Sequence, residues 1–273
     1  MAFVDFRKAY DTVWREALFY KLINSDVNGL FLTLLVDIYE KYKIQIKLQG
    51  GLTETLTANI GLKQGCVLSP ILFNFYVNDL PNIFSNPNCN PITLHNEKIS
   101  CLMYADDLVI LSTDKVGLQH CLKNLSEYCD TWKLEVNIDK TKIIIFNKNG
   151  RLHGKDIFVY KDKQVEVVRS YKYLGVIFTI SGTNTELTKN LRERASKAMF
   201  KILKTFGGKI ENCDIGSHLF KHMIKPILLY SSGVWGAHLY DFGRIFNDND
   251  TNTDKFFGKN QIELLHTKFN KML

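Results

Sequence analysis

The segment LMYADDLVIL, residues 102–111, places two adjacent carboxylates between two apolar runs. Such runs are typical of strands in a buried sheet, and Asp106 and Asp107 fall at the turn between them. Two ionised carboxylates about 4 Å apart repel each other by roughly 4 kcal/mol at an effective dielectric constant near 20. A hard divalent cation with oxygen ligands would offset this repulsion, and a surface hairpin with an acidic tip is the alternative interpretation.

A third carboxylate at the end of another strand favours the metal interpretation. Asp5 offers one, because it follows the short apolar run at residues 2–4. Three acids on neighbouring strand ends can hold two metal ions about 4 Å apart, which activate a hydroxyl and stabilise a leaving oxygen in phosphoryl transfer. Asp11 competes with Asp5, but it lies where the chain turns helical, and we interpret it as a charge at a helix N-terminus.

Hydrophobic periodicity predicts strands with helices crossing between them, which is an α+β arrangement. The run ILFNFYVNDL, residues 71–80, is apolar on most sides, as in a buried helix. Strands are expected at 2–4, in a hairpin turning at 50–51, at 92–111, at 142–146, in a hairpin at 157–168 and at 171–179; helices are expected at about 12–42 with a break near 28–29, at 71–80, at 118–132, beyond 181 with an apolar stripe at 191–206, and at about 214–230.

Composition is that of an ordinary globular protein. Of the 273 residues, 45% are hydrophobic and 23% are charged. No apolar run reaches the roughly 18 residues that a membrane span needs, and charges at Asp5, Arg7 and Lys8 argue against a signal peptide. We therefore expect an intracellular protein with no membrane partner. The six cysteines form no C-x-x-C pair and are expected to be free thiols.

Most of the net charge of +7 lies in one segment. Residues 181–240 hold nine basic and four acidic side chains, an excess of five. Such a concentration is a candidate phosphate-facing surface, with a solvated helix face as the alternative. Four of these bases form one stripe of the predicted helix that includes residues 191–206: Arg194, Lys197, Lys201 and Lys204.

Five segments in order resemble motifs A to E of the reverse transcriptases of non-LTR (LINE-type, Jockey/RTE-like) retrotransposons. The segments are AFVDFRKAYDTVWREAL, GLKQGCVLSPILFNFYVNDL, LMYADDLVILS, LEVNIDKTKIIIF and YKYLGVIFT. The resemblance spans residues 2–180. It implies a right-hand polymerase palm over residues 1–180, followed over residues 181–273 by a mostly helical thumb and the start of a connection segment.

The resemblance implies RNA-directed DNA polymerase activity. Asp5, Asp106 and Asp107 would hold two Mg²⁺ ions, or Mn²⁺, and Phe6 would lend its backbone carbonyl to one of them. The primer 3′-hydroxyl would attack the α-phosphorus of a deoxynucleoside triphosphate, and pyrophosphate would leave. The implied partners are an RNA template, a DNA primer and the deoxynucleoside triphosphate, in the nucleus or cytoplasm of a eukaryotic host.

Further residues match the motifs, but for several of them a purely structural role is an alternative interpretation. Tyr10 would reject a 2′-hydroxyl, although a core aromatic is the alternative. Gln64 and Gly65 would approach the nucleotide and template, and the physical case for Gly65 is close backbone approach. The motif D lysine matches Lys140, with Lys142 as a rival, and either is also interpretable as a surface lysine. Three residues match the turn that grips the primer end, Tyr173, Leu174 and Gly175, and the four bases of the stripe fit a thumb helix that follows the nucleic-acid backbone.

Departures from the family pattern lead to the expectation of a fragment. Only four residues precede Asp5, so the fingers region that comes before motif A is expected to be absent and synthesis by this chain alone to be weak or lacking. The main alternative is a retroelement remnant that binds nucleic acid without catalysis. Another two-metal palm enzyme, such as a nucleotidyl cyclase, is a third alternative, but motifs B and E would have no evident role in such an enzyme. An intron-encoded maturase is the nearest alternative among reverse transcriptases.

Overall fold

The strand that ends before Asp5 runs through the middle of a six-stranded sheet. The computed structural model describes residues 1–152, 156–208, 210 and 212–235, and β1 (Ala2–Val4) lies between β9 and β10. Neighbouring strands pair antiparallel except for β10 and β12, which pair parallel. In the order β11-β12-β10-β1-β9-β8, the other strands are β11 (Phe158–Tyr160), β12 (Lys163–Val167), β10 (Lys142–Ile143), β9 (Asp107–Ile110) and β8 (Cys101–Tyr104).

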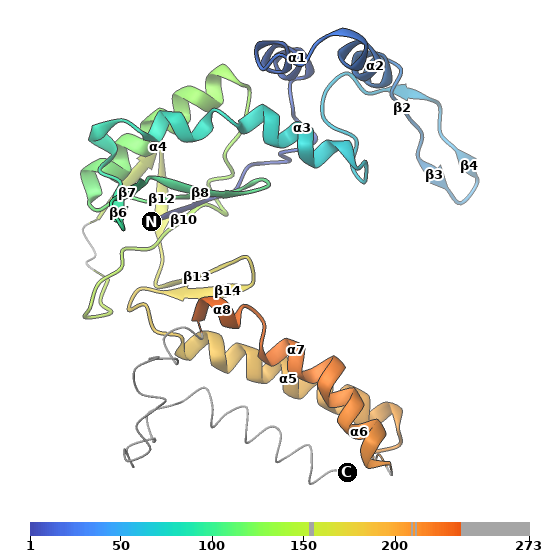
Figure 1. The fold of residues 1–273 in the computed structure, drawn as a ribbon, viewed down its shortest axis with the longest axis vertical. Helices are drawn as coiled ribbons and strands as arrows, with labels where there is room; N and C mark the ends of the chain where they lie inside the picture. The colour runs from blue at the N-terminus through green and yellow to red at the C-terminus, as the bar shows by residue number, and fades with distance from the viewer. Residues whose placement is uncertain (153–155, 209, 211, 236–273) are drawn as a thin grey trace. The chain divides into compact units, whose positions relative to one another are not determined.

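This sheet belongs to the first of two compact units, Met1–Ile145 with Leu152–Val168. Helices α1 (Arg15–Asn24), α3 (Leu68–Val77) and α4 (Lys115–Thr131) contribute to its core, and Figure 1 shows α4 lying across the sheet. Leu118, Leu122, Leu125 and Cys129 of α4 are all buried. Spacings of three and four residues place these side chains on one face, so the predicted amphipathic helix is confirmed.

Two buried cations tie α1 into this core. Lys21 donates to the carbonyl oxygen of Tyr76 at 2.6 Å and to the hydroxyl of Tyr128 at 3.0 Å, and it forms an ion pair with Asp79. Its ammonium also lies 3.6 Å from the ring centroid of Trp132. The other cation is Arg15. Buried charges persist only when hydrogen bonds satisfy them, so both side chains fix α1 against its neighbours.

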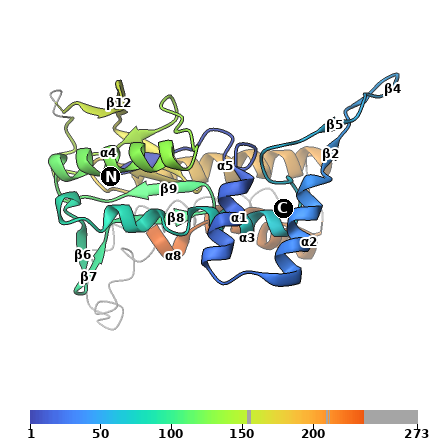
Figure 2. The same cartoon turned by 90° about the horizontal axis from the view of Figure 1, so that it is seen from above.

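A ribbon of short strands follows α2 (Gly29–Glu40), as the hairpin pattern predicts. Figure 2 shows it projecting away from α1 and α2. Ile44, Ile46 and Leu48 alternate with polar residues as expected but are all exposed, because no second layer covers either face among the described residues. The ribbon consists of β2 (Lys43–Ile44), β3 (Lys47–Leu48), β4 (Gly51–Leu52) and β5 (Leu56–Thr57).

Three local expectations are wrong in detail. The first helix begins at Arg15 rather than Thr12, because the amides of Asp11 and Thr12 both bond to the carbonyl of Lys8 in a turn. Helix α3 buries one face only, and Ile71 is 52% exposed. The segment expected as one strand at 171–179 is a hairpin.

That hairpin consists of β13 (Ser170–Tyr173) and β14 (Val176–Thr179). Its turn residues, Leu174 and Gly175, both have positive φ, at 46° and 81°. Positive φ at both central residues is the pattern of the tight turn whose twist matches that of a two-stranded ribbon. Residue type alone gives no turn signal at an apolar leucine, but the resemblance to motif E had indicated a turn at Tyr173, Leu174 and Gly175.

The second unit, Phe146–Arg151 with Arg169–Leu273, holds this hairpin and the helices expected beyond residue 181. Its core includes Ala195, Met199, Ile202 and Leu228. Residues 236–273, which belong to the expected thumb and connection segment, lie outside the described residues. The helical elements are α5 (Thr185–Thr205), α6 (Cys213–Leu219), the π-helical segment η3 (Phe220–Ile224), α7 (Lys225–Leu228) and α8 (Ser232–Trp235).

The described residues thus form a mixed α/β fold with mainly antiparallel sheets. No helix within them is both long and apolar enough to cross a membrane. Five described cysteines are free, in agreement with the thiol prediction. The remaining elements of the first unit are η1 (Leu80–Phe84), η2 (Pro87–Cys89), β6 (Ile92–Leu94) and β7 (Glu97–Ile99).

Replacing Asp114 with alanine should destabilise the first unit. Its Oδ1 accepts from the amide of Gly117 at 2.7 Å at the start of α4, and its Oδ2 accepts from the Asn90 side chain at 2.8 Å. Loss of an N-cap costs about 0.5–2 kcal/mol, so urea denaturation of Asp114→Ala should show a drop in this range. Glu193→Ala, at an exposed acid in α5, is the control. Equal unfolding free energies for the two variants would contradict the capping role.

Candidate active site

The register of β1 against β9 brings Asp5 to Asp107. Val4 pairs with Leu108 in the antiparallel ladder. One residue further along both strands, the same register sets Asp5 opposite Asp107. Directly opposed residues on antiparallel strands have Cβ atoms about 4.5–5.5 Å apart. Two acids that are distant in sequence are therefore neighbours at one end of the sheet's central strands.

Asp106 lies in the tight turn that joins β8 to β9. Tyr104 pairs with Asp107, which leaves Ala105 and Asp106 as the two turn residues. Ala105 has a φ of 54°, a left-handed conformation that costs a residue with a Cβ about 1–3 kcal/mol. The predicted pair of strands with an acidic turn is confirmed, and the strained turn sets Asp106 beside Asp107.

Electrostatics at this turn agrees with the repulsion expected from the sequence. The pKa of the Asp107 carboxyl is raised above its ordinary value, first by partial burial and then by the negative charges of Asp106 and Asp5. A raised pKa in a carboxyl means that its ionised form is disfavoured there. The three acids therefore form a site that gains from a nearby cation.

Lys140 is a cation from the chain itself at this site. Its Nζ lies 3.7 Å from Oδ2 of Asp5. The rival lysine, Lys142, instead pairs with Glu166 of β12 at 2.6 Å. Of the two motif D candidates, Lys140 is the one at the carboxylates. Because 68% of its side chain is exposed, solvent screens this pair and leaves Lys140 able to change partner.

The backbone of Phe6 faces the acids rather than the strand on its other side. Phe6 forms an antiparallel bridge with Val136, but the bonds to segment 135–137 come from the Arg7 amide at 2.7 Å and the Asp5 carbonyl at 2.8 Å. Successive backbone groups point to opposite edges of an extended chain. The carbonyl oxygen of Phe6 is therefore directed to the edge where Asp106 and Asp107 lie.

These donors suit a hard divalent ion in their chemistry. Mg²⁺ and Mn²⁺ prefer carboxylate and carbonyl oxygens, which Asp5, Asp106, Asp107 and the Phe6 carbonyl supply. Within the described residues, however, no three His, Cys, Asp or Glu side chains are gathered closely enough to enclose a metal ion. The acids influence one another electrostatically without converging on one point.

Tyr10 packs as the core-aromatic alternative predicts, and its hydroxyl is influenced by the acidic turn. Its ring stacks on Phe73, with 4.7 Å between ring centroids and 26° between ring planes. The pKa of its hydroxyl is raised by burial and then by the negative charge of Asp106. Tyr10 therefore packs against the core with its ring and lies near the acidic turn.

The GLKQG loop, residues 61–65, is attached to the turn after β1. Gln64 Nε2 donates to Oδ1 of Asp11 at 2.7 Å. Asp11 is therefore a loop partner, and its interpretation as a helix N-terminal charge is wrong. Gly65 needs its φ of 77°, yet a Cβ there would meet no protein atom. Close backbone approach within the protein occurs instead at Gly61, where a Cβ would lie 2.4 Å from the Asp11 carbonyl oxygen.

The remaining predicted residues lie in the second unit. Tyr173, Leu174 and Gly175 form the β13–β14 turn, which Tyr230 covers by donating its hydroxyl to the Leu174 carbonyl at 3.0 Å. The sequence gave no sign of this tyrosine's role. The four bases of the α5 stripe are exposed, and none of them takes part in an ion pair within the described residues.

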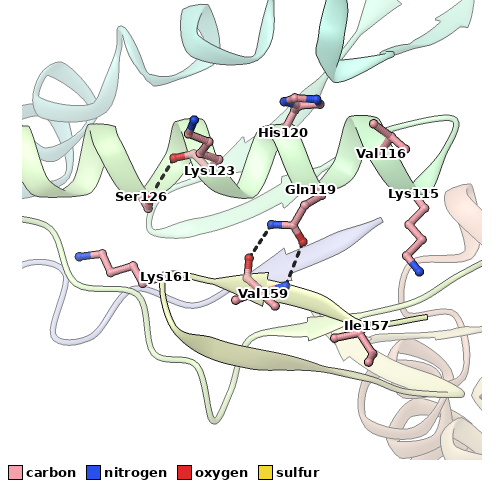
Figure 3. Close-up of a pocket in the computed structure, with 9 residues that line it drawn as sticks. All are labelled: Lys115, Val116, Gln119, His120, Lys123, Ser126, Ile157, Val159 and Lys161. Atoms are coloured by element: carbon pink, nitrogen blue, oxygen red, sulfur yellow. Dashed lines mark hydrogen bonds between the residues drawn. The ribbon is translucent and has the colours of Figure 1, made fainter. Parts of the chain in front are cut away.

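A pocket of about 450 Å³ lies elsewhere in the first unit, between α4 and β11. Figure 3 shows Gln119 facing the edge strand, where its side-chain amide donates to the Val159 carbonyl at 2.7 Å and accepts from the Val159 amide at 2.9 Å. Three lysines at its rim (Lys115, Lys123 and Lys161) each have an acidic partner within 4.0 Å. None of the predicted site residues lines this pocket.

Comparison with known proteins decides the family. Residues 1–178 match the family model described as "Reverse transcriptase (RNA-dependent DNA polymerase)". The chain belongs to the reverse transcriptase family. The matched residues include β1, the GLKQG loop, the acidic turn and the β13–β14 turn, so all five motifs proposed from the sequence lie within the matched region except for Thr179, the last residue of the fifth.

Relatives of this reverse transcriptase chain come from non-LTR retrotransposons. It is 25% identical over 248 residues to the RNA-directed DNA polymerase from mobile element jockey of Drosophila melanogaster, covering 86% of this chain and 26% of that protein. It is 22% identical over 244 residues to the probable RNA-directed DNA polymerase from transposon X-element of the same species, covering 86% of this chain and 25% of that protein. A Pol polyprotein from the R2 element of Popillia japonica is 27% identical over 221 residues, covering 74% of this chain and 36% of that protein.

The reverse transcriptase chain thus spans about a quarter of the length of the jockey protein. These relatives agree with the resemblance to non-LTR elements that the motifs indicated.

Asp107→Asn should stabilise the metal-free chain at neutral pH. The raised pKa of Asp107 means that ionising this group costs the folded state more than the unfolded state. At pH values above the pKa of Asp107 in the folded state, removing its charge should raise the free energy of unfolding. This gain should become smaller as the pH falls toward about 3.9, the pKa of an aspartate in the unfolded chain. Urea denaturation at several pH values with a chelator present measures it. A variant less stable than the parent at pH 7 would contradict the repulsion described above.

Proposed function

We propose that this chain carries the palm and thumb of an RNA-directed DNA polymerase from a non-LTR retrotransposon. The palm is assigned to residues 1–180 and the thumb to residues 181–273. The observation that carries the proposal is the β1–β9 register, which sets Asp5 beside the Asp106–Asp107 turn. A strand-end carboxylate next to an acidic turn suits two-metal nucleotidyl transfer.

Asp5, Asp106, Asp107 and the carbonyl oxygen of Phe6 are the proposed ligands of two Mg²⁺ ions, with Mn²⁺ as a substitute. When bound, such ions lower the pKa of the primer 3′-hydroxyl and neutralise charge on the phosphates. The carboxylates must move closer together to hold them. Asp106 lies in a two-residue turn and Asp5 directly follows a strand, so the proposal requires a rearrangement of these side chains to bring the oxygens together.

The residues around the acids orient the substrates. The Tyr10 ring, held by Phe73, stands next to Asp106, where a 2′-hydroxyl on the incoming nucleotide would meet it. Gln64 and Gly65 present the exposed part of their loop to the nucleotide and template. Lys140 already lies at Asp5, so its ammonium is placed to donate a proton to the departing pyrophosphate or to attract it.

The second unit is proposed to hold the nucleic acid. The turn formed by Tyr173, Leu174 and Gly175 contacts the primer end, and the exposed bases of α5 follow the phosphate backbone of primer and template. Backbone contacts of this kind give affinity without reading sequence. The chain would act in the nucleus or cytoplasm of a eukaryotic host, where the element's RNA and the nucleotides are available.

A nucleic-acid-binding role without catalysis is the second candidate. The observation that favours it is that the acids do not converge into a metal-binding group within the described residues. In this alternative the basic face of α5 binds primer and template, and the carboxylates contribute nothing.

Primer extension separates the two candidates. On poly(rA) with an oligo(dT) primer and Mg²⁺ or Mn²⁺, the parent chain should add deoxynucleotides at the low level expected from the sequence, and the double variant Asp106→Asn, Asp107→Asn should lose at least about 100-fold of that activity because charge stabilisation of the phosphates is removed. Asp162→Asn, in the exposed β11–β12 turn, should retain full activity. Extension by neither chain, with primer–template binding intact in both, would support the non-catalytic role.

Neutralising the α5 stripe should weaken binding in a salt-dependent way. For each phosphate that the protein no longer neutralises, the slope of log K against log salt should fall by about 0.9. The variant replaces Arg194, Lys197, Lys201 and Lys204 with glutamine. A control replaces four exposed lysines of the first unit, Lys41, Lys98, Lys123 and Lys163. Fluorescence anisotropy with a labelled primer–template at several salt concentrations measures both slopes, and equal slopes would contradict the assignment.

A further inference from the structure

Arg15, at the first position of α1, has a guanidinium group buried among backbone carbonyl oxygens. The residue is only 5% exposed. Its Nε donates to Gly61 at 2.8 Å, and its Nη2 donates to Ile60 at 3.0 Å. Its Nη1 donates to Ala58 at 2.6 Å and to Tyr39 at 3.0 Å. A single side chain thus binds the backbone at both the end of α2 and the segment 58–61.

This buried cation has no carboxylate partner among the ion pairs of the described residues. The rings of Tyr39 and Tyr42 lie 5.1 and 5.8 Å from its central carbon and add cation–π attraction. Burial lowers the pKa of the guanidinium, yet arginine stays charged in proteins. Since a buried charge without hydrogen-bond partners is costly, the four carbonyl groups must remain directed at Arg15. This side chain therefore restrains the path of segment 58–61, together with the backbone hydrogen bonds of that segment.

Segment 58–61 leads directly into the exposed part of the GLKQG loop. The Gly61 amide donates to the Val13 carbonyl at 2.9 Å, and the Leu62 amide donates to the Tyr10 carbonyl at 2.7 Å. A Cβ at Gly61 would lie 2.4 Å from the Asp11 carbonyl oxygen, so the two backbones are in direct contact. Tyr10 and the loop thus form one backbone-bonded assembly next to the acidic turn.

We propose that Arg15 is a positioning residue for the nucleotide site. By holding segment 58–61, it sets where Gln64 and Gly65 lie relative to Tyr10, and so the width of the gap in which the sugar and base of the incoming nucleotide are held. This inference rests on the proposed function. Arg15 itself touches no substrate, and it acts through the loop.

The shape of arginine explains why another cation does not replace it. A guanidinium spreads five N–H donors in a rigid plane, whereas a lysine ammonium is a compact point charge on a flexible stem. Arg15→Lys keeps the buried charge but cannot reach carbonyls on both sides at once. Arg15→Gln removes the charge and most of the donors.

Amide hydrogen exchange of the whole chain tests the positioning without any turnover. In both Arg15 variants, the Gly61 and Leu62 amides should exchange at least about tenfold faster than in the parent, as expected for local opening, while amides of β1 and β9 stay within about twofold. Arg151→Lys and Arg151→Gln, at an exposed arginine, are the matched controls and should leave the loop unchanged. Arg15→Lys keeps the test readable if Arg15→Gln does not fold.

Steady-state primer extension supplies the second readout. Arg15→Lys should raise the KM for the deoxynucleotide at least about tenfold with a smaller change in kcat, because the loop orients the nucleotide and not the reacting groups. Three results would overturn the positioning role. Two concern amide exchange: the Gly61 and Leu62 amides exchange at the parent's rate, or they and the amides of β1 and β9 become faster by the same factor. The third is a loss of kcat of at least about tenfold with KM for the deoxynucleotide unchanged. A parent chain that extends no primer supports the non-catalytic candidate over the catalytic one, and the exchange experiment still decides whether Arg15 positions the loop.

Discussion

Repulsion among Asp5, Asp106 and Asp107 is the unfavourable interaction that the pairing of β1 with its two neighbouring strands has to offset. The backbone keeps these acids near one another, because Asp5 follows a strand that is paired on both edges and Asp107 begins one of its two neighbours. β1 is bonded to β9 and β10 and is almost fully buried. The hydrophobic free energy of burying β1 keeps the acids near one another despite their repulsion. A bound cation would relieve that repulsion and so stabilise the fold.

Buried cations extend the same logic to the elements around the sheet. Arg15 and Lys21 both come from α1 and both use backbone carbonyl oxygens as acceptors. One fixes the GLKQG loop beside Tyr10, and the other binds the end of α3 to α4 through Tyr76 and Tyr128. Charged groups buried in this way give direction as well as stability, because each needs its acceptors in particular places. Helix α1 thereby connects the loop to the layer of helices on the sheet.

Patterns that depend on neighbouring residues were readable from the sequence. The alternation around Asp106 and the stripe of α4 come from periods of two and 3.6, which any buried sheet or amphipathic helix imposes. The lysine that lies at Asp5, the partner of Gln64 and the role of Arg15 were open or missed, because each depends on contacts between segments far apart in the chain. Asp11 was misread for the same reason, since its partner is 53 residues away.

The glycines of the GLKQG loop show the same difference. Gly65 was expected to allow close backbone approach, yet in the structure that approach occurs at Gly61, whereas Gly65 requires only a positive φ. Sequence alone cannot distinguish close approach from positive φ, because the absence of a Cβ permits both.

We propose that the strand register brings these three acids near one another so that they bind divalent metal. Anomalous diffraction from crystals of the chain soaked in Mn²⁺ tests it most directly. The account predicts manganese peaks within coordination distance of the carboxylates of Asp5, Asp106 and Asp107, and their loss in the Asp106→Asn, Asp107→Asn variant. Manganese absent from this end of the sheet, with the β1–β9 register intact, would contradict it.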